Sequence, residues 1–284
     1  MKIGAHVSTA GGLHTAFGRA DEMGAETIQI FASSPRAWKF RDLKPEVVQQ
    51  FHEASGETGI APVFIHGSYL VNIAGTPELI EKSVECLIRN MEVAAEIGAT
   101  GVVFHAGSHK GRGFDAVIGA AASALTEVLE ASPPGPLLLV ENSAGMGAHL
   151  GASFEELGEM ISAVGSDRFK VCLDTEHCFA AGYDIANPDV IDAAMEEFDN
   201  CIGLDRLVVV HANDAKVEMG SGVDRHDNIG EGHIGIEGFE VIMGHEAFSD
   251  VPFILEVPGP DKKGPDKDNV DRLKDIRSRL QSGA

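Results

Sequence analysis

The sequence has few basic residues, and this shortage restricts how it could bind other molecules. It contains 22 lysines and arginines against 44 aspartates and glutamates, which gives a net charge of −22. Sequence-independent binding to nucleic acid depends on basic side chains that neutralise phosphates, so this composition argues against it, although a local binding face remains compatible with it. We interpret the excess acid as an ordinary solvated surface or, alternatively, as adaptation to high salt.

Cysteines are equally scarce and follow no regular spacing. The four of them, Cys86, Cys172, Cys178 and Cys201, form no C-x-x-C pair. The sequence therefore predicts neither a disulfide framework nor a thiolate zinc site. We expect reduced thiols, with Cys86 and Cys172 in the core, and no nucleophilic role for Cys178.

Several further sequence features are missing. There is no apolar run of about 18 residues and no signal-peptide pattern at MKIGAHVS, so we expect a soluble, cytoplasmic protein without a membrane partner. No repeat or linker divides the chain, so residues 1–284 are expected to form one domain. The Gly pair at 11–12 is too short for a phosphate-binding loop, and we expect no nucleotide cofactor.

What the sequence does contain is a regular alternation of strand and helix. Strands are predicted at 2–7 and 27–31 and in six apolar runs that end at residues 66, 105, 141, 174, 211 and 256. Helices are predicted between them, with start signals at Ser8 and Thr9, Pro45, Pro77, Asp115, the capping box Ser153 with Glu156, the pair Asn187-Pro188, and a last helix over 270–280. Eight such units predict an α/β protein with a single-domain (β/α)8 TIM barrel.

The six apolar runs share one further property: each ends on a residue that can bind a transition metal. These residues are His66, His105, Glu141, Asp174, His211 and Glu256. The C-terminal ends of barrel strands gather at one face, so we expect the six side chains to converge. Imidazoles and carboxylates together suit zinc or manganese.

Two loop motifs extend this set. DTEH at 174–177 adds His177, and DRH at 224–226 adds Asp224 and His226. Nine candidate ligands are too many for one metal ion and suit three, with at least one carboxylate shared. The loop of about 25 residues after the seventh strand is long enough to be expected to serve a function.

The motifs also resemble those of a known family, the endonuclease IV apurinic/apyrimidinic endonucleases. The resemblance covers nearly the full length, through GAHVSTAGGL, FASSPRAW, HGSYLVNIA, FHAGSH, VENSAGMG, LDTEHCFAAGYD, HANDAK, VDRHDNIGEGHIG and ILEVP. It implies a zinc-dependent barrel that binds three zinc ions, with manganese possible at one site, and acts as a monomer on double-stranded DNA that contains abasic sites.

The resemblance implies roles for individual residues. One zinc is held by His66, His105 and Glu141, a second by Glu141, Asp174, His211 and Glu256, and a third by His177, Asp224 and His226. Glu141 is thereby the central catalytic residue. Arg36, Tyr69 and Leu70 match the positions that enter DNA beside the lesion. From the residues alone, Tyr69 and Leu70 are better interpreted as packing residues at a helix start, and Arg36 as part of a surface ion pair.

The implied reaction is hydrolysis of the phosphodiester 5′ to an abasic site, giving a 3′-hydroxyl and a 5′-deoxyribose phosphate. Two departures from the family pattern concern the metal sites: Ala106 replaces a proline after His105, and Glu176 adds a carboxylate before His177. Two alternatives stay open, a metal-dependent sugar isomerase, which would leave the third ligand group without a purpose, and a non-catalytic metal-binding or lesion-binding protein.

Overall fold

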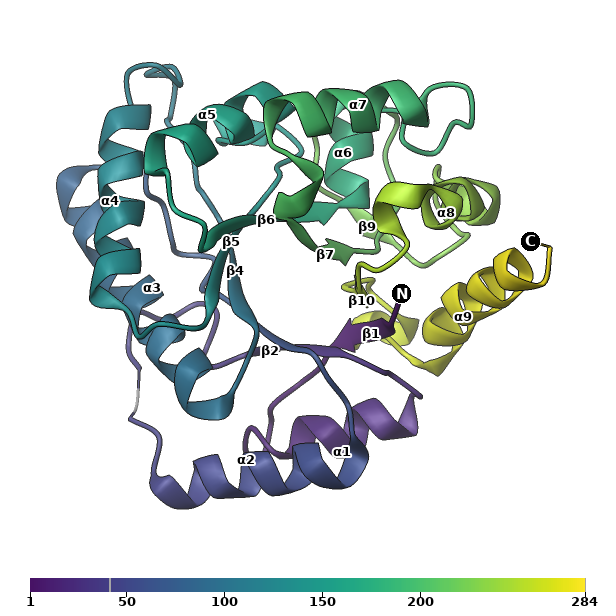
Figure 1. The fold of residues 1–284 in the computed structure, drawn as a ribbon, viewed down its shortest axis with the longest axis horizontal. Helices are drawn as coiled ribbons and strands as arrows, with labels where there is room; N and C mark the ends of the chain where they lie inside the picture. The colour runs from purple at the N-terminus through teal and green to yellow at the C-terminus, as the bar shows by residue number, and fades with distance from the viewer. Residues whose placement is uncertain (41, 284) are drawn as a thin grey trace.

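The fold is an eight-stranded parallel barrel surrounded by helices, as the sequence predicts (Figure 1). A computed structural model describes residues 1–40 and 42–283. The barrel closes in the order β1-β10-β7-β6-β5-β4-β3-β2. Its strands are β1 (Ile3–His6), β2 (Ile28–Phe31), β3 (Val63–His66), β4 (Gly101–His105), β5 (Leu137–Glu141), β6 (Phe169–Asp174), β7 (Leu207–His211) and β10 (Phe253–Leu255).

Helices follow the strands, and most of them cover the outside of the barrel (Figure 1). They are α1 (Thr15–Glu22), α2 (Pro45–Thr58), α3 (Pro77–Ile97), α4 (Ile118–Ala131), α5 (Phe154–Val164), α6 (Thr175–Ala181), α7 (Ile191–Cys201), α8 (Gly235–Gly244) and α9 (Lys267–Ser282). Proline opens α2 and α3, where its missing N–H costs nothing, and Gly98 ends α3 in the left-handed conformation. Among the described residues, no helix has both the length and the apolar character needed to span a bilayer.

Four details of the predicted helices are wrong. Ser8 and Thr9 do not cap α1, which begins at Thr15 after a series of turns. The helix expected from Asp115 begins at Ile118. Asn187-Pro188 does not cap α7: the Asn187 side chain accepts a hydrogen bond from the Asp189 N–H, which makes a turn ahead of the helix. The predicted last helix, 270–280, extends over Lys267–Ser282 because Asp266 caps it.

The capping box at Ser153 is half confirmed. The Ser153 hydroxyl accepts from the Glu156 N–H, as predicted, but the Glu156 carboxylate accepts from the Gly151 N–H instead of the Ser153 N–H. The carboxylate therefore fastens the preceding loop to α5. The helix α6 was not predicted, and it carries His177.

The barrel interior contains its own small apolar cluster, separate from the core between strands and helices. It is formed by Phe64, Val103, Leu139, Cys172, Val209 and Ile254, one residue from each of six strands. Side chains two residues apart in a strand point to the same side. Two residues beyond each member of the cluster stands one of the six predicted strand-end ligands, so the apolar cluster is the floor on which these ligands lie.

Candidate metal centre

The six strand-end residues do converge, and Glu141 lies at their centre. Its Oε2 is 2.9 Å from His105 Nε2 and 3.3 Å from His66 Nε2. Its Oε1 is 3.1 Å from His211 Nδ1 and 3.3 Å from His177 Nδ1. The two oxygens of one buried carboxylate thus face two different groups of imidazoles, which is the geometry of a bridging ligand.

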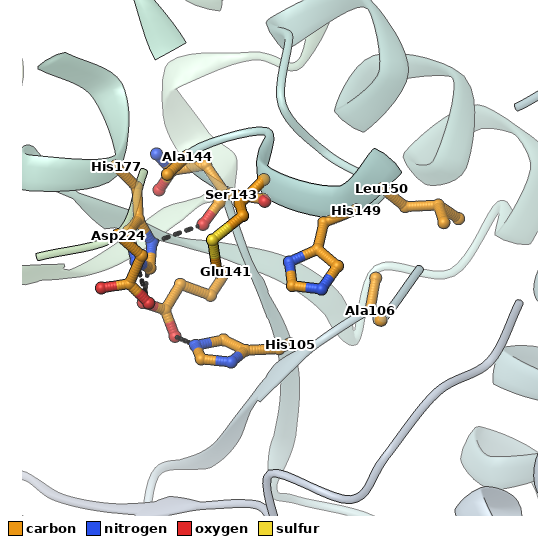
Figure 2. A pocket seen from close by; sticks show the side chains of 12 residues that line it. His105, Ala106, Glu141, Ser143, Ala144, His149, Leu150, His177 and Asp224 are labelled. Carbon is orange, nitrogen blue, oxygen red and sulfur yellow. Dashed lines mark hydrogen bonds and ion pairs between the residues drawn. The ribbon is translucent and has the colours of Figure 1, made fainter. Parts of the chain in front are cut away.

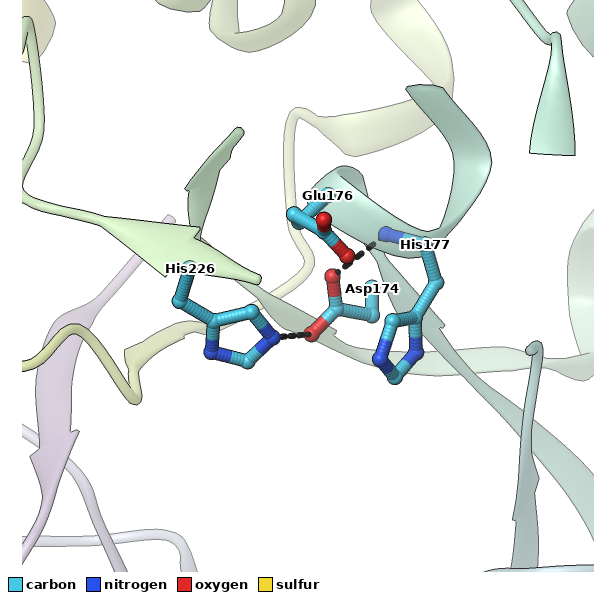
Figure 3. A group of neighbouring side chains, drawn as sticks. All are labelled: Asp174, Glu176, His177 and His226. Carbon is cyan, nitrogen blue, oxygen red and sulfur yellow. Dashed lines mark hydrogen bonds and ion pairs between the residues drawn. The ribbon is translucent and has the colours of Figure 1, made fainter. Parts of the chain in front are cut away.

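Three overlapping groups of potential ligands result. One potential ligand atom per residue lies within 4.8 Å of the others in each of three sets: His66, His105 and Glu141; Glu141, Asp174, His211 and Glu256; and Asp174, Glu176, His177 and His226. The first two sets coincide with the predicted ones. The third contains Glu176, which is not among the predicted ligands (Figure 3).

Asp224 lies beside this third set. Its carboxylate oxygens are each 3.5 Å from a histidine nitrogen, Oδ2 from His177 Nε2 and Oδ1 from His226 Nε2. Figure 2 shows Asp224 and His177 on the same side of Glu141. The predicted trio of His177, Asp224 and His226 is therefore together in space.

The orientation of the histidines tests whether these groups suit metal ions. His66 Nδ1 donates to the Gly67 carbonyl, and His177 Nδ1 donates to the Asn142 carbonyl, both at 2.8 Å. His211 Nε2 donates to Gln29 Oε1 at 3.0 Å. When a ring is neutral, as metal binding requires, its other nitrogen presents a lone pair to carboxylate oxygens that can only accept. Such opposed acceptors are stabilised by a cation between them, so the donor sets fit divalent metal ions.

Protonation in the metal-free chain points the same way. Burial opposes the charge on Glu141, yet the charges of His105 and His211 hold its pKa well below the usual value. Burial also opposes protonation of His177, but the charge of Asp174 raises the pKa of this imidazole well above 6.5. Protons therefore supply the positive charge that the site requires, and metal binding would displace them.

Supporting residues that the sequence patterns did not reveal fix the ligands from behind. His6 Nδ1 and Gln29 Nε2 both donate to Glu256 Oε1, at 2.7 and 2.6 Å. Asn213 donates to Asp174 Oδ2 at 2.6 Å and accepts from the Glu256 N–H. His6 and Gln29 also sit on barrel strands, in register with each other. Their strand positions were the available signal, but neither ends a continuous apolar run.

The long loop after β7 is organised by one buried carboxylate. Asp214 accepts hydrogen bonds from the backbone N–H groups of Ala215, Gly230, Gly232, Ile234 and Gly235. Within this loop, β8 (Asp214–Ala215) pairs antiparallel with β9 (His226–Asp227). Asp214 therefore fastens the loop that carries Asp224 and His226.

The residues predicted to contact DNA lie at the mouth of the barrel. The Tyr69 side chain is 52% exposed, and its ring lies 5.7 Å from His66 and 6.0 Å from His105 between ring centroids. The Tyr69 N–H donates to the Pro35 carbonyl, which joins its loop to the one that carries exposed Arg36. Leu70 is half-buried. Tyr69 thus lies beside the metal centre, and the bond to Pro35 brings the loop of Arg36 next to the loop of Tyr69.

A cavity of about 40 Å³ opens beside Glu141, enough for one or two water molecules. His105, Ala106, His149, His177 and Asp224 contribute to its lining (Figure 2). Cys178 does not reach it: this thiol is fully buried, accepts a hydrogen bond from Asn142, and has a pKa raised by burial. A nucleophilic cysteine is therefore not supported, as predicted.

Comparisons with known proteins cover nearly the full length of the chain. Residues 17–278 match the family described as xylose isomerase-like TIM barrel. A probable endonuclease 4 from Haloarcula marismortui is 39% identical over 279 residues, covering 98% of this chain and 99% of the relative. One from Halothermothrix orenii is 41% identical over 261 residues, covering 91% and 94%.

Solved structures extend the comparison. Endonuclease IV from Thermus thermophilus superposes with a TM-score of 0.86 at 36% identity, covering 99% of this chain and 100% of that one. A D-tagatose 3-epimerase-like protein superposes with a TM-score of 0.72 at 22% identity, over 99% and 97% of the two chains. The second likeness concerns the fold alone.

Proposed function

Because the chain belongs to the endonuclease IV family, we propose that it hydrolyses the phosphodiester 5′ to abasic sites in double-stranded DNA, leaving a 3′-hydroxyl and a 5′-deoxyribose phosphate for base excision repair. The observation that carries the proposal is the position of Glu141, whose two oxygens face separate groups of histidines. We also propose that the protein acts as a monomer, because one chain supplies all the candidate ligands, and that it acts in the cytoplasm.

The proposed cofactor is three zinc ions, with manganese as an alternative at one site. His66, His105 and Glu141 hold the first ion, and Glu141 is shared with a second that Asp174, His211 and Glu256 also hold. His177, Asp224 and His226 contribute to the third. The hydrogen bonds that the rings donate to Gly67, Asn142 and Gln29 leave the required ring nitrogens free to bind.

Bound divalent ions would acidify water and polarise the phosphate oxygens, so that water can attack phosphorus near neutral pH. The chain itself supplies positioning. Glu141 fixes the separation of two ligand groups, and Asn213 holds Asp174 and the backbone of Glu256 in place. Cys178 is buried away from the cavity, which leaves water as the attacking group.

DNA binding would use the side chains at the mouth. An exposed aromatic ring and a leucine can enter a kinked duplex beside the lesion, and an arginine can contact the backbone; Tyr69, Leu70 and Arg36 are the corresponding residues. The overall charge of −22 does not oppose this, because the bound cations attract phosphate locally.

A sugar isomerase is the second candidate, favoured by the shared fold of the epimerase-like protein. Such an enzyme needs one metal ion and a polyol site. In such an enzyme, the separate cluster formed by His177, Asp224 and His226 would have no function. This third group favours the endonuclease.

The deciding experiment is incision of an end-labelled duplex with one tetrahydrofuran abasic-site analogue, before and after chelation, together with metal content by mass spectrometry. Incision 5′ to the analogue with about three metals per chain supports the proposal. Intact DNA with one metal per chain, and turnover of ketose sugars, would favour the isomerase.

A further inference from the structure

We propose that Glu176 is a direct ligand at the third site, which makes this site a four-donor, two-carboxylate site that binds Mn²⁺ more readily than the trio of His177, Asp224 and His226 would. The inference deepens the proposed function, since it concerns the third cation of the same centre. It starts from a side chain that the family resemblance does not number among the ligands.

The first observation is the position of Glu176. It lies in the first turn of α6, its side chain is 0% exposed, and one of its oxygens falls within the group that Asp174, His177 and His226 form. Figure 3 shows its carboxylate directed toward Asp174, between the two histidines. A buried carboxylate therefore lies close enough to two imidazoles for one metal ion to bind all three side chains.

The second observation is an oxygen without a partner. Glu176 Oε1 accepts from the Arg225 N–H at 2.9 Å, but the buried Oε2 receives no hydrogen bond from the residues that the structure describes. His226 Nε2 in the same group is also buried and without a hydrogen bond. An unsatisfied buried carboxylate oxygen is costly, and a cation shared with the imidazole would satisfy both atoms.

Neighbouring side chains do not supply the missing charge. The Arg225 guanidinium donates to the Asp224 carbonyl instead of to Glu176. Asp174 already has both oxygens engaged, Oδ1 by the His177 N–H and Oδ2 by Asn213. Asp174 is also already assigned to the second ion, so of these two carboxylates Glu176 is the one with a buried oxygen that accepts no hydrogen bond and with no other ion to hold.

The extra carboxylate changes the chemistry of the site. With Asp224 alone, a divalent cation keeps a formal charge of +1, whereas Asp224 and Glu176 together neutralise it. Oxygen-rich donor sets suit Mn²⁺, while imidazole-rich sets favour Zn²⁺ over Mn²⁺. The third cation should therefore be held more tightly, and the discrimination against Mn²⁺ should be smaller.

Glu176→Gln is the decisive variant. Glutamine keeps the size of the side chain and an oxygen that can accept from the Arg225 N–H, but it removes the negative charge. The control is Glu155→Gln, because Glu155 is exposed and also lies in the first turn of a helix. Metal content would be measured by mass spectrometry after dialysis against graded chelator, and Mn²⁺ binding by electron paramagnetic resonance.

In the wild type and in the control, we expect equal retention of all metals. In Glu176→Gln, one metal per chain should be lost at chelator concentrations about 10-fold to 100-fold lower. Mn²⁺ affinity should fall more than Zn²⁺ affinity. Glu176→Asp keeps the charge and should stay closer to the wild type than Glu176→Gln does.

Unchanged chelator resistance and an unchanged Mn²⁺ spectrum in Glu176→Gln would overturn the inference, as would a weaker metal site in Glu176→Asp than in Glu176→Gln. The proposed function is tested separately by incision with the wild type. If the wild type incises DNA but Glu176→Gln retains its metals as well as the wild type does, only the inference about Glu176 is rejected. If the wild type does not incise DNA but Glu176→Gln loses one metal, only the proposed function is rejected.

Discussion

Replacement of Asp214 by asparagine should loosen the long loop after β7 and empty the third metal site. Five backbone N–H groups point at the two Asp214 oxygens, at 2.8 to 3.2 Å. An amide has one oxygen, so in either orientation at least two of these N–H groups would face an NH2 group that cannot accept.

The magnitude follows from these lost bonds. A hydrogen bond to a charged group contributes about 1.5 to 3 kcal/mol, so two of them amount to about 3 to 6 kcal/mol. For a domain of this size, about 1 kcal/mol shifts the melting temperature by roughly 2 to 4 °C. We expect Asp214→Asn to melt at least about 6 °C lower, and to lose one metal ion because Asp224 and His226 lie on the loop.

The assay is thermal denaturation at a fixed scan rate, with metal content by mass spectrometry. Asp205→Asn is the control for the same chemical change: Asp205 is exposed, and its surface ion pair with Lys170 at 3.3 Å contributes at most about 1 kcal/mol. Gly232→Ala perturbs the same place by another route: a Cβ there would lie 2.4 Å from the Ala215 carbonyl oxygen and 2.5 Å from Asp214 Oδ1. A melting temperature within about 1 °C of the wild type and full metal content in both loop variants would refute the reasoning.

Three further predictions concern catalysis, DNA and pH. Glu141→Gln should lower turnover about 10³-fold or more, with an unchanged circular dichroism spectrum, because the shared carboxylate is lost; near-normal turnover would contradict its central role. Tyr69→Ala should weaken binding to an abasic duplex about 10-fold in fluorescence anisotropy without changing metal content, whereas loss of metal would identify Tyr69 as a structural support. Burial opposes the charge of Glu26, but hydrogen bonds from Arg277 lower its pKa to about 2. The ion pair of Glu26 with Arg277 therefore contributes fully to the free energy of unfolding above about pH 5, and this contribution disappears as the pH falls toward 2. Since Glu26 is 33% exposed, we discount this contribution to about 1 kcal/mol. The Glu26→Gln variant should melt a few degrees below the wild type at pH 7, and this difference in melting temperature should shrink below pH 5. A difference that stays constant from pH 7 to pH 3 would count against this ion pair.

The sequence predicts the barrel and the strand-end residues well because both depend on short-range patterns. Each of the six apolar runs ends on its ligand candidate, and parallel strands that close a barrel must bring those ends together. His177, Asp224 and His226 were found from their motifs, and the structure places them around one point.

The supporting residues could not be predicted in the same way. His6 and Gln29 meet Glu256 across 250 and 227 residues of sequence, through hydrogen bonds that no local pattern specifies. The orientation of Glu176 depends on the Arg225 N–H, which comes from a loop 49 residues away. The early start expected for α1 failed because Gly11 and Gly12, both with positive φ, keep the preceding residues in turns.

The apolar floor of the barrel also restricts how such a chain can change in length. Each strand-end ligand stands two residues beyond a floor residue, so inserting or deleting one residue within a strand would turn the ligand outward and remove its neighbour from the floor at the same time. Insertions are therefore tolerable in the loops and not in the strands. Variation in substrate range can arise around the mouth, by lengthening segments such as the one that carries Arg36, while the positions of the six strand-end side chains stay the same.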